Sequence, residues 1–345
     1  MSSFHREREI TNLKRLEDIK PGLPPFCNRF FLGMAQTTSP LTRLNYAYDL
    51  RQFFEFLTRE VDIFVGRKMF EFELEDLENI TTFHIELFAN QICNGEKGVM
   101  RKLACLRTLF KYFYKRDEIK NNAPAKVDMP KLHDKPIVRL DKTEMLELIR
   151  AVGNGEGLSK GQQRFHDLTT LRDETIIIFF LSTGLRISEL VGLNIGDIDL
   201  QRGSFKVTRK GGNQVILFMP EELKDQLTLY LGASDETENL ELTNKARNEP
   251  LFKSIQNKRI SVRAVQNLVG KYARLAVPLK NISPHKLRST FGTNLYHNTK
   301  DIYIVADVLG HKDVNTTKKH YAAISDDVRR DAAGKVKLFD EESCD

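Results

Sequence analysis

Residues 283–291 read SPHKLRSTF, and this segment predicts the start of a helix with polar side chains on one face. The Ser-Pro pair is typical of an N-cap followed by the first helical residue, so we expect a helix over His285–Tyr296. His285 and Arg288 are three positions apart, which places both on one face beside a neighbouring apolar face. Taken alone, such a pair is more often incidental than functional.

Two further polar residues follow at the boundaries of expected helices. Asp301 is a good N-cap for a helix that stops at Gly310, so His311 stands directly after the helix stop. Tyr321 comes ten positions after His311, in a helix that residues 315–316 can cap. For Tyr321 the alternative is a half-buried tyrosine that only packs.

An arginine also stands at a helix break earlier in the chain. Residues 173–183 show a strongly apolar helical pattern that ends at Gly184, and Arg186 follows directly after this break. Glu189 lies close enough along the chain to orient the guanidinium of Arg186. Taken alone, Arg186 is more often a structural arginine that pairs with a carboxylate.

A β-hairpin is predicted between these two regions. SFKVT at 204–208 and QVILF at 214–218 are typical of strands, and RKGGN at 209–213 joins them. The paired glycines supply the positive φ that a hairpin turn requires. The turn carries Lys210, so one lysine is expected at the end of this hairpin.

Length and composition indicate a soluble protein of about two domains. The 345 residues are 41% apolar and 29% charged, which is ordinary for a core-forming protein and excludes a disordered or collagen-like chain. No apolar run approaches the length of a membrane span and the N-terminus lacks the apolar core of a signal peptide, so we expect a cytoplasmic protein. The four cysteines are sparse and not closely spaced, which favours reduced thiols and no zinc site.

The domain boundary is predicted at residues 121–138. Pro124, Pro130 and Pro136 recur there among lysines, a composition that favours an extended linker. On either side of this segment, apolar periodicity predicts several helices. They are expected over residues 40–59, from 81 or 82 onward, around 103–113 and over 143–152, with a loop at 153–161.

The net charge of +6 is unevenly distributed. Residues 60–78 contain seven acids and two bases, whereas residues 97–135 contain eleven bases and four acids. Arg107, Lys111 and Lys115 step along the helix around 103–113 at four-residue spacing and form a basic stripe beside its apolar face. The stripe is either a phosphate-facing surface or an ordinary solvated helix face.

Together, the polar residues singled out above suit metal-free attack on a phosphodiester. Arginines hold the non-bridging oxygens and neutralise the charge that grows in a pentacoordinate transition state. A tyrosine can be the nucleophile if a base takes its proton, and a lysine can protonate the departing oxygen. No Asp/Glu metal cluster accompanies these motifs. The set comprises Arg186, Lys210, His285, Arg288, His311 and Tyr321.

These motifs resemble those of the tyrosine recombinases, most closely the Xer-type bacterial members. SPHKLRSTF at 283–291, VLGHK at 308–312 and TTKKHY at 316–321 resemble the family's HxLR, LGH and terminal tyrosine pattern in order and spacing. TGLRISEL at 183–190 resembles its first arginine motif. The resemblance covers most of the chain, because residues 39–57 are similar to the opening helix of the family's core-binding domain.

The resemblance implies a role for each residue of the set. Tyr321 would attack the scissile phosphate and give a 3′-phosphotyrosyl link and a free 5′-hydroxyl. Arg186 and Arg288 would grip the phosphate, and Lys210 would act as the general acid towards the 5′-oxygen. The basic stripe would be the DNA-binding part of the preceding domain.

The two histidines would support the same reaction. His285 would assist proton transfer from Tyr321, and His311 would hydrogen-bond a phosphate oxygen. Because the covalent link conserves the energy of the phosphodiester, the resemblance implies no metal ion, no ATP and no other cofactor. A 5′-hydroxyl from a second duplex reverses the step, so a homo-tetramer on two synapsed sites would exchange strands pairwise.

The implied fold is mainly α, a two-domain C-shaped clamp around duplex DNA. It joins a helical core-binding domain to a mostly helical catalytic domain with a small antiparallel sheet. The expected boundaries are an N-terminal extension at 1–38, the helical, SAM-like core-binding domain at 39–120, a linker at 121–138, and the catalytic domain with a C-terminal tail helix at 139–345.

The implied function is site-specific recombination of duplex DNA at a specific recombination site. An Xer-like role in chromosome or plasmid dimer resolution and an integrase or excisionase of a mobile element are competing roles. A septal DNA translocase or another accessory protein is a further partner that the resemblance allows, and no membrane partner is expected. A type IB topoisomerase would share the catalytic residues without pairing two sites. A catalytically inactive DNA-binding regulator is the alternative from another class, and the six intact residues argue against it.

Overall fold

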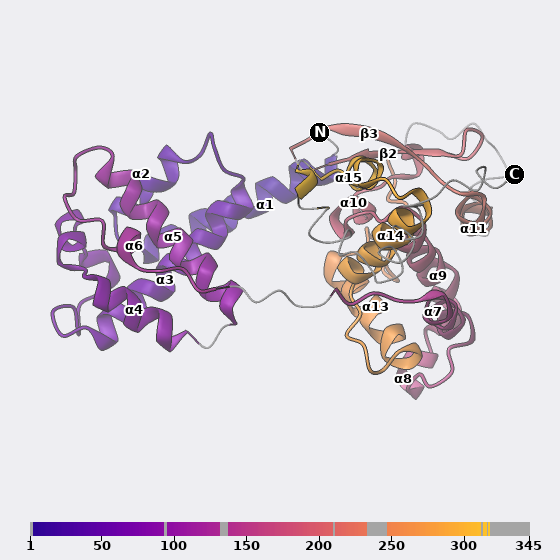
Figure 1. Cartoon of the computed structure of the whole chain (residues 1–345), viewed down its shortest axis with the longest axis horizontal. Helices are drawn as coiled ribbons and strands as arrows, with labels where there is room; N and C mark the ends of the chain where they lie inside the picture. Colours follow the sequence, from indigo (N-terminus) through magenta and orange to yellow (C-terminus); the bar gives the residue numbers. More distant parts are fainter. Residues whose placement is uncertain are drawn as a thin grey trace, which may run out of the picture. The chain divides into compact units, whose positions relative to one another are not determined.

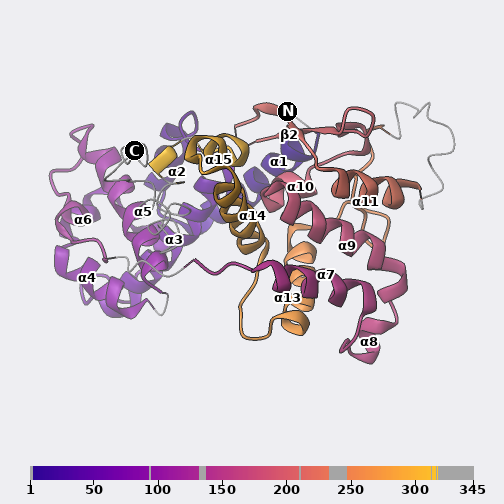
Figure 2. The ribbon, with the colours of Figure 1, turned by 45° about the vertical axis from the view of Figure 1, so that its right-hand side comes forward.

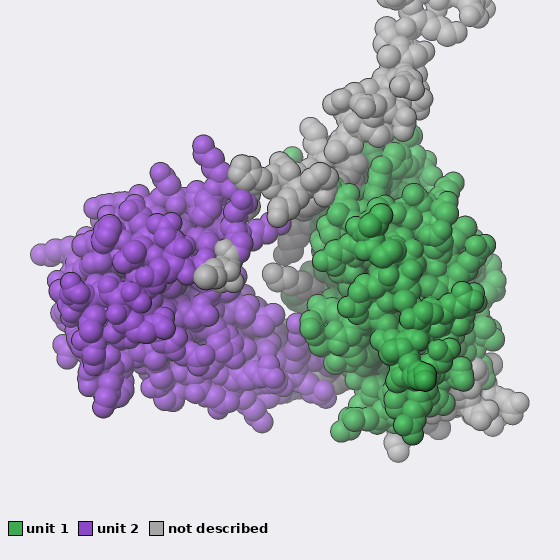
Figure 3. All heavy atoms as spheres, turned by 90° about the horizontal axis from the view of Figure 1, so that it is seen from below, with its two compact units in different colours: residues 1–2, 136–345 green, residues 3–135 purple. Residues whose placement is uncertain are grey.

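The computed structural model describes residues 3–92, 95–131, 137–209, 211–232, 247–311, 313–315 and 317. The chain divides into two compact units, which Figure 3 colours separately. The N-terminal unit comprises residues 3–135 and the C-terminal unit begins at Pro136. Both units are mainly helical, and the small sheet belongs to the C-terminal unit (Figure 1). The expected fold class is thus confirmed as mainly α, in two parts.

The N-terminal unit is built on two long helices, α3 and α5, around an apolar core. Ser39 Oγ accepts a hydrogen bond from Thr42 N, and Pro40 occupies the first helical position, which confirms the predicted start of α3. Aromatic rings fill the core in largely edge-to-face pairs, such as Phe53 with Phe88. The α-helices are α1 (Ser3–Ile19), α2 (Phe26–Gly33), α3 (Pro40–Glu60), α4 (Thr82–Gln91), α5 (Glu96–Tyr114) and α6 (Ala123–Lys126), with short 3-10 helices at Lys20–Gly22, Met69–Glu71 and Leu74–Asn79.

The residues expected as an N-terminal extension are part of this unit. Helix α1 packs along α3, and Phe26, Phe30 and Phe31 of α2 are buried in the common core. No helix was predicted before residue 40. Helix α1 has weak amphipathic patterning because it is rich in charged residues throughout, so its periodicity alone does not reveal it.

The first part of the expected linker is not extended. Ala123 and Pro124 are buried in the short helix α6, and Asn121 Nδ2 donates to the backbone carbonyls of Leu77, Glu78 and Ile80. These bonds hold the segment against the N-terminal unit. A proline at the first turn of a helix is as compatible with the sequence as a proline in an extended linker, which explains the difference.

The C-terminal unit is arranged around α9, which packs against α7, α11 and α14 (Figure 2). Buried apolar side chains of α9 face these neighbours on several sides, in agreement with its apolar sequence. The predicted loop at 153–161 is shorter than expected, because α7 continues to Asn154 and Ser159 caps α8, which begins at Lys160. The α-helices are α7 (Lys142–Asn154), α8 (Lys160–Gln163), α9 (His166–Thr183), α10 (Ile187–Val191), α11 (Glu221–Gly232), α13 (Val262–Ala276), α14 (Pro284–Thr299) and α15 (Ile302–Leu309), with a 3-10 helix at Ile195–Asp197.

A three-stranded antiparallel sheet completes the C-terminal unit. Its strands β1 (Ile198–Asp199), β2 (Ser204–Thr208) and β3 (Gln214–Phe218) follow one another in sequence order. Phe205 pairs with Leu217 across β2 and β3, and Phe205 is buried. Both strands of the predicted hairpin have the predicted bounds, because alternating burial and a Gly-Gly turn are strong local signals.

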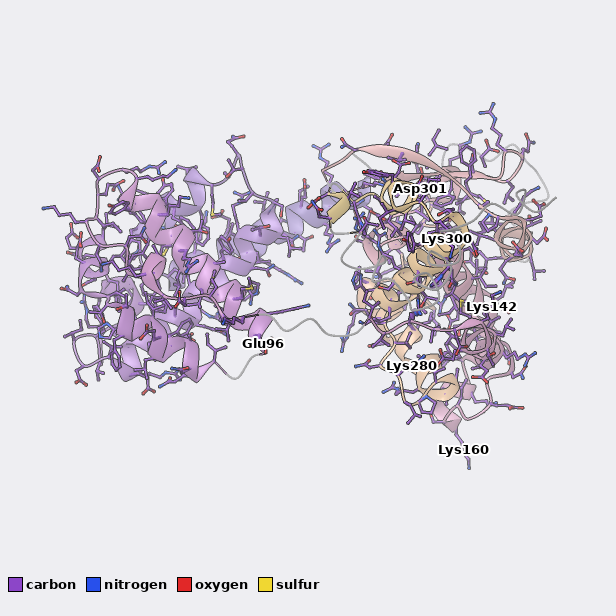
Figure 4. The ribbon with its side chains drawn as sticks, in the orientation of Figure 1. Glu96, Lys142, Lys160, Lys280, Lys300 and Asp301 are labelled. Carbon is purple, nitrogen blue, oxygen red and sulfur yellow. The ribbon has the colours of Figure 1, made fainter. Side chains whose placement is uncertain are left out.

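The junction between α14 and α15 determines where the second of these helices ends. Lys300 has a φ of 55° and ends α14, and the carboxylate of Asp301 then accepts hydrogen bonds from Tyr303 N and Ile304 N. Figure 4 labels both residues at this corner. The predicted N-cap at Asp301 is confirmed. Helix α15 contains eight residues and stops at Gly310, which brings His311 to the start of the following segment.

Candidate active site

Arg186 is held at the start of α10 by its own helix turn. Its backbone N–H donates to Glu189 Oε2 at 2.9 Å, and its Nη1 donates to Glu189 Oε1 at 2.8 Å. Glu189 is buried, so its carboxylate orients the guanidinium in a partly dry environment. The prediction that Glu189 orients Arg186 is confirmed.

Gly184 brings this arginine close to two other helices. It ends α9 with a φ of 61°, and a Cβ at this position would lie 2.4 Å from Phe291 Cδ1 and 2.9 Å from Leu309 Cδ2. Only glycine combines this backbone angle with such a close approach. The end of α9 therefore packs directly against α14 and α15, and Arg186 follows at that point.

Arg288 lies within α14 and contacts both the end of α9 and the end of α15. Its side chain is 3% exposed. Nη1 donates to the carbonyl of Gly184 at 2.6 Å, and Nη2 donates to the carbonyl of Leu309 at 2.6 Å. A buried guanidinium satisfied by backbone carbonyls at separate helix ends fixes the relative positions of those ends.

The C-terminus of α15 is the point on which three arginines converge. The last carbonyls of an α-helix have no partner within the helix and carry the negative end of its dipole. Here Arg209 donates to the carbonyls of Asp307 and Val308, and Arg186 Nη2 donates to the carbonyl of Gly310 at 3.0 Å. With Arg288 on Leu309, the carbonyls of residues 307–310 each accept from a guanidinium. This arrangement gathers positive charge at one helix end.

His311 lies within this group of arginines. Its Nε2 is 3.2 Å from Arg288 Nη2, and its Nδ1 is 2.8 Å from Thr317 Oγ1. The structure therefore brings Arg186, Arg288 and His311 together, although they come from the start of α10, the interior of α14 and the end of α15. Such a group of side chains can bind a tetrahedral oxyanion, because guanidinium and imidazole groups form charge-assisted hydrogen bonds to its oxygens.

His285 lies one turn before Arg288 on α14 and differs from it in exposure. Its side chain is exposed, whereas that of Arg288 is buried. On the helix face that the two residues were expected to share, Arg288 is buried and binds backbone carbonyls, whereas His285 is exposed.

Lys210 and Tyr321 lie outside the described residues, as does the expected tail helix. The residues that flank Lys210 are described. Arg209 N donates to Asn213 O at 2.8 Å, and Gly211 and Gly212 have positive φ, so the hairpin turn forms as predicted. The bonds from Arg209 to α15 connect this hairpin to the helix end that precedes His311.

Arg209 and Thr317 were not singled out from the sequence. Arg209 directly precedes the turn lysine, and Thr317 belongs to the TTKKHY segment, so both lie in motifs that were noticed. The hydrogen-bond partner of Arg209 lies 98 positions later in the chain, whereas Thr317 lies six positions after its partner His311. Only the threonine had a usable signal, because a polar residue one helical turn before the expected nucleophile can face the same site.

The basic stripe of the N-terminal unit divides into two parts. Lys111 is exposed on α5, and Lys115 is exposed directly after the last residue of this helix. Arg107 differs from the expectation, because its Nε donates to Pro124 O at 2.9 Å and its Nη2 donates to Val127 O. Its guanidinium fastens α6 to α5, so the exposed charge available to a phosphate comes from the two lysines.

Neither a metal centre nor a membrane span was found in the part of the chain that the structure describes. Within those residues, no group of three or more His, Cys, Asp or Glu side chains is placed to hold a metal ion. Among the described helices, none is both long enough and apolar enough to cross a bilayer.

Comparison with known proteins adds independent findings. The model of the phage integrase family matches residues 139–327. Tyrosine recombinase XerC of Thermodesulfovibrio yellowstonii is 32% identical over 254 residues, which cover 73% of this chain and 80% of the relative. The solved XerH site-specific recombinase bound to its difH substrate has a TM-score of 0.60 at 20% identity, over 87% of this chain and 81% of that one. The Tn1549 transposon integrase in complex with circular intermediate DNA has a TM-score of 0.62 at 18% identity, over 89% of this chain and 98% of that one.

Proposed function

Because this chain belongs to the phage integrase family of tyrosine recombinases, which cleave and rejoin DNA through a tyrosine nucleophile, we propose that it recombines DNA at a specific site with Tyr321 as that nucleophile. The observation that carries the proposal is the convergence of Arg186, Arg288 and His311 at the end of α15. Three donors at one helix end form a receptor for a single phosphodiester.

The proposed cleavage step begins when a scissile phosphate occupies this receptor. Its non-bridging oxygens take hydrogen bonds from Arg186 and Arg288, which are held at the end of α15 in the chain without DNA. Donors that are in place before the reaction stabilise the developing charge without reorganisation. His311 donates a further hydrogen bond to a phosphate oxygen.

The bond changes balance within the site. The phenolic oxygen of Tyr321 attacks phosphorus and forms the 3′-phosphotyrosyl bond, while the bond from phosphorus to the 5′-oxygen breaks. His285 assists removal of the tyrosine proton, and Lys210 supplies a proton to the 5′-oxygen. Attack by a 5′-hydroxyl from a second duplex reverses these changes and joins the exchanged strand, so the phosphodiester energy is conserved. Strand exchange between two synapsed sites engages four copies of the chain.

The N-terminal unit supplies sequence-independent contacts to the DNA backbone in this proposal. Lys111 is exposed on α5 and Lys115 is exposed at its C-terminal end, whereas the other face of this helix is buried in the core. Exposed lysines attract phosphates and release counterions on binding. In this proposal the N-terminal unit and the C-terminal unit both bind the duplex.

We assign the cellular role to Xer-like resolution of chromosome or plasmid dimers. Support comes from the XerC relative, which covers most of this chain, and from the fold shared with XerH. This role places the protein in the cytoplasm and makes a septal DNA translocase or accessory protein a candidate partner. Movement of a mobile element is the second candidate, because the Tn1549 transposon integrase shares the fold to a similar extent.

The experiment that tests the proposal compares two DNA products. Mapping the bound positions in the protein's own genome supplies a site, which is then placed on two duplexes. A site-specific recombinase yields recombinants only from site-bearing duplexes, whereas a topoisomerase relaxes any supercoiled plasmid. Relaxation without recombinants contradicts the proposal. The genomic position of the site distinguishes the two roles, since a chromosomal dimer-resolution site does not lie at the end of a mobile element.

A further inference from the structure

His311 is held through both nitrogens of its ring. Nε2 lies 3.2 Å from Arg288 Nη2, and Nδ1 lies 2.8 Å from Thr317 Oγ1. Thr317 is fully buried, so its hydroxyl is shielded from water, and it lies four positions before Tyr321. A single buried hydroxyl thus connects the histidine to the segment that leads to the proposed nucleophile.

The chemistry of these partners determines where the ring proton lies without DNA. A guanidinium only donates hydrogen bonds, so a neutral His311 accepts from Arg288 at Nε2. The proton of the ring is then on Nδ1, and Nδ1–H donates to Thr317 Oγ1. The hydroxyl acts as an acceptor in this state.

The proposed reaction requires the opposite arrangement. To hydrogen-bond a phosphate oxygen, His311 must donate from Nε2. A neutral ring then carries no proton on Nδ1, which must accept a hydrogen bond. The ring charge does not change, because one proton passes from Nδ1 to water and one passes from water to Nε2. Only a partner that both donates and accepts satisfies Nδ1 in the two states, and a hydroxyl is such a partner.

We propose that Thr317 is a positioning residue for His311, whose hydroxyl accepts from Nδ1 in the free protein and donates to Nδ1 when a phosphate occupies the site. This assignment rests on the proposed function, since it deepens the role given to His311. The hydroxyl keeps the ring plane fixed while the proton changes nitrogen. Misplacement of a catalytic group by about 1 Å costs on the order of 100-fold in rate, so removal of this hydrogen bond has a measurable effect.

Three variants separate positioning from simple packing. Thr317→Val keeps the branched shape and removes the hydroxyl, whereas Thr317→Ser keeps the hydroxyl. Thr293→Val is the matched control, because Thr293 is also buried and donates to Ser289 O at 2.9 Å within α14. Single-turnover cleavage of a nicked duplex that carries the mapped site should fall by about 10- to 100-fold in Thr317→Val. Thr317→Ser and Thr293→Val should remain within about threefold of the unsubstituted protein.

A spectroscopic measurement tests the same assignment without activity. Nitrogen-15 spectra of histidine-labelled full-length protein show which ring nitrogen carries the proton, and a His311→Gln spectrum assigns the signals. The DNA-free protein should show the proton on Nδ1, and Tyr321→Phe protein bound to the duplex should show it on Nε2. The Nδ1 proton should exchange slowly with water in the free protein and rapidly in Thr317→Val.

The outcomes distinguish the role of Thr317 from the proposed function. Equal cleavage by Thr317→Val and Thr293→Val, or an unchanged Nδ1 signal in Thr317→Val, overturns the assignment of Thr317. If Thr317→Val does not fold, a ring proton on Nε2 in the DNA-free protein overturns it without that variant. If the unsubstituted protein binds the duplex and never cleaves it, the proposed function fails, and the spectra of the free protein still decide whether Thr317 holds His311.

Discussion

Arg288 Nη2 lies 3.2 Å from His311 Nε2, although the two residues are 23 positions apart in the chain. The same guanidinium also holds the carbonyls of Gly184 and Leu309. One side chain therefore contacts the end of α9, the end of α15 and the imidazole of His311. The proposed catalytic step requires these contacts of Arg288 to be in place before DNA binds.

Replacement of Arg288 by lysine should abolish the paired hydrogen bonds while the positive charge remains. A single ammonium lacks the planar fork that reaches both carbonyls, so cleavage should fall by about 100-fold or more while DNA binding changes little. Rates of covalent adduct formation and binding constants provide the measurement. Arg259→Lys is the control, because Arg259 also donates to two backbone carbonyls, those of Val191 and Leu193. An equal decrease in the cleavage rate of the two variants would mean that Arg288 only stabilises the fold.

Gly310 should not tolerate alanine. Its φ is 63°, and an added Cβ would lie 2.3 Å from Arg209 Nη1. Arg209 would have to release the carbonyls of Asp307 and Val308. We expect a decrease of about 1–2 kcal/mol in unfolding free energy from the unfavourable backbone angle alone.

Gly270→Ala is the matched control for this decrease. Gly270 lies within α13, and an added Cβ there meets no atom within 4 Å. Alanine should stabilise that helix by up to about 1 kcal/mol. Urea unfolding of both variants gives the comparison, and a Gly310→Ala protein as stable as the unsubstituted one would contradict the described end of α15.

The basic stripe on α5 should show two different kinds of behaviour. Reversal of Lys111 and Lys115 to glutamate should weaken binding to every duplex and reduce the salt slope by about one for each phosphate that these lysines neutralise, with little change in sequence preference. Arg107→Ala should instead lower the stability of the N-terminal unit, because its guanidinium holds the carbonyls of Pro124 and Val127. Binding isotherms at several salt concentrations and thermal unfolding separate the two effects. An unchanged salt slope in the double reversal would identify the lysines as an ordinary solvated face.

The two described cysteines should be unreactive in the folded chain. Cys27 and Cys105 are buried in the core of the N-terminal unit, and burial raises the pKa of both thiols. Since the thiolate is the reactive form, alkylation should be slow until the unit opens. In a Cys93→Ser, Cys344→Ser protein, the labelling rate should follow the unfolding equilibrium in urea. Rapid labelling without denaturant would contradict this packing.

Local signals in the sequence were sufficient for several elements. The hairpin, the Ser39 cap of α3 and the Asp301 cap of α15 depend on residues close in sequence, and each appears where it was predicted. The three-arginine arrangement was not predictable in the same way. It depends on the approach of α9 to α14 and α15 at Gly184, which results from tertiary packing.

The roles of individual charged residues also depend on tertiary packing, so the sequence alone did not reveal them. Arg107 and Lys111 have equivalent positions in a helical pattern, yet only Arg107 reaches a backbone segment, and that segment follows 17 or more positions later. Arg209 and Lys210 are neighbours in the predicted turn, yet the hydrogen bonds of Arg209 to α15 span nearly a hundred positions. Residue type and spacing therefore predicted which residues form the candidate site, whereas the partners of each side chain required the structure.

Formation of a covalent complex tests the central claim most directly. A nicked duplex that carries the mapped site should trap the protein through a 3′-phosphotyrosyl bond, because the short 5′-fragment diffuses away and cannot reverse the step. Mass spectrometry of the digested complex should locate the DNA adduct on Tyr321, and Tyr321→Phe should bind the duplex without forming the complex. An adduct on another residue, or a complex of equal yield in Tyr321→Phe, would contradict the assignment of Tyr321 as the nucleophile.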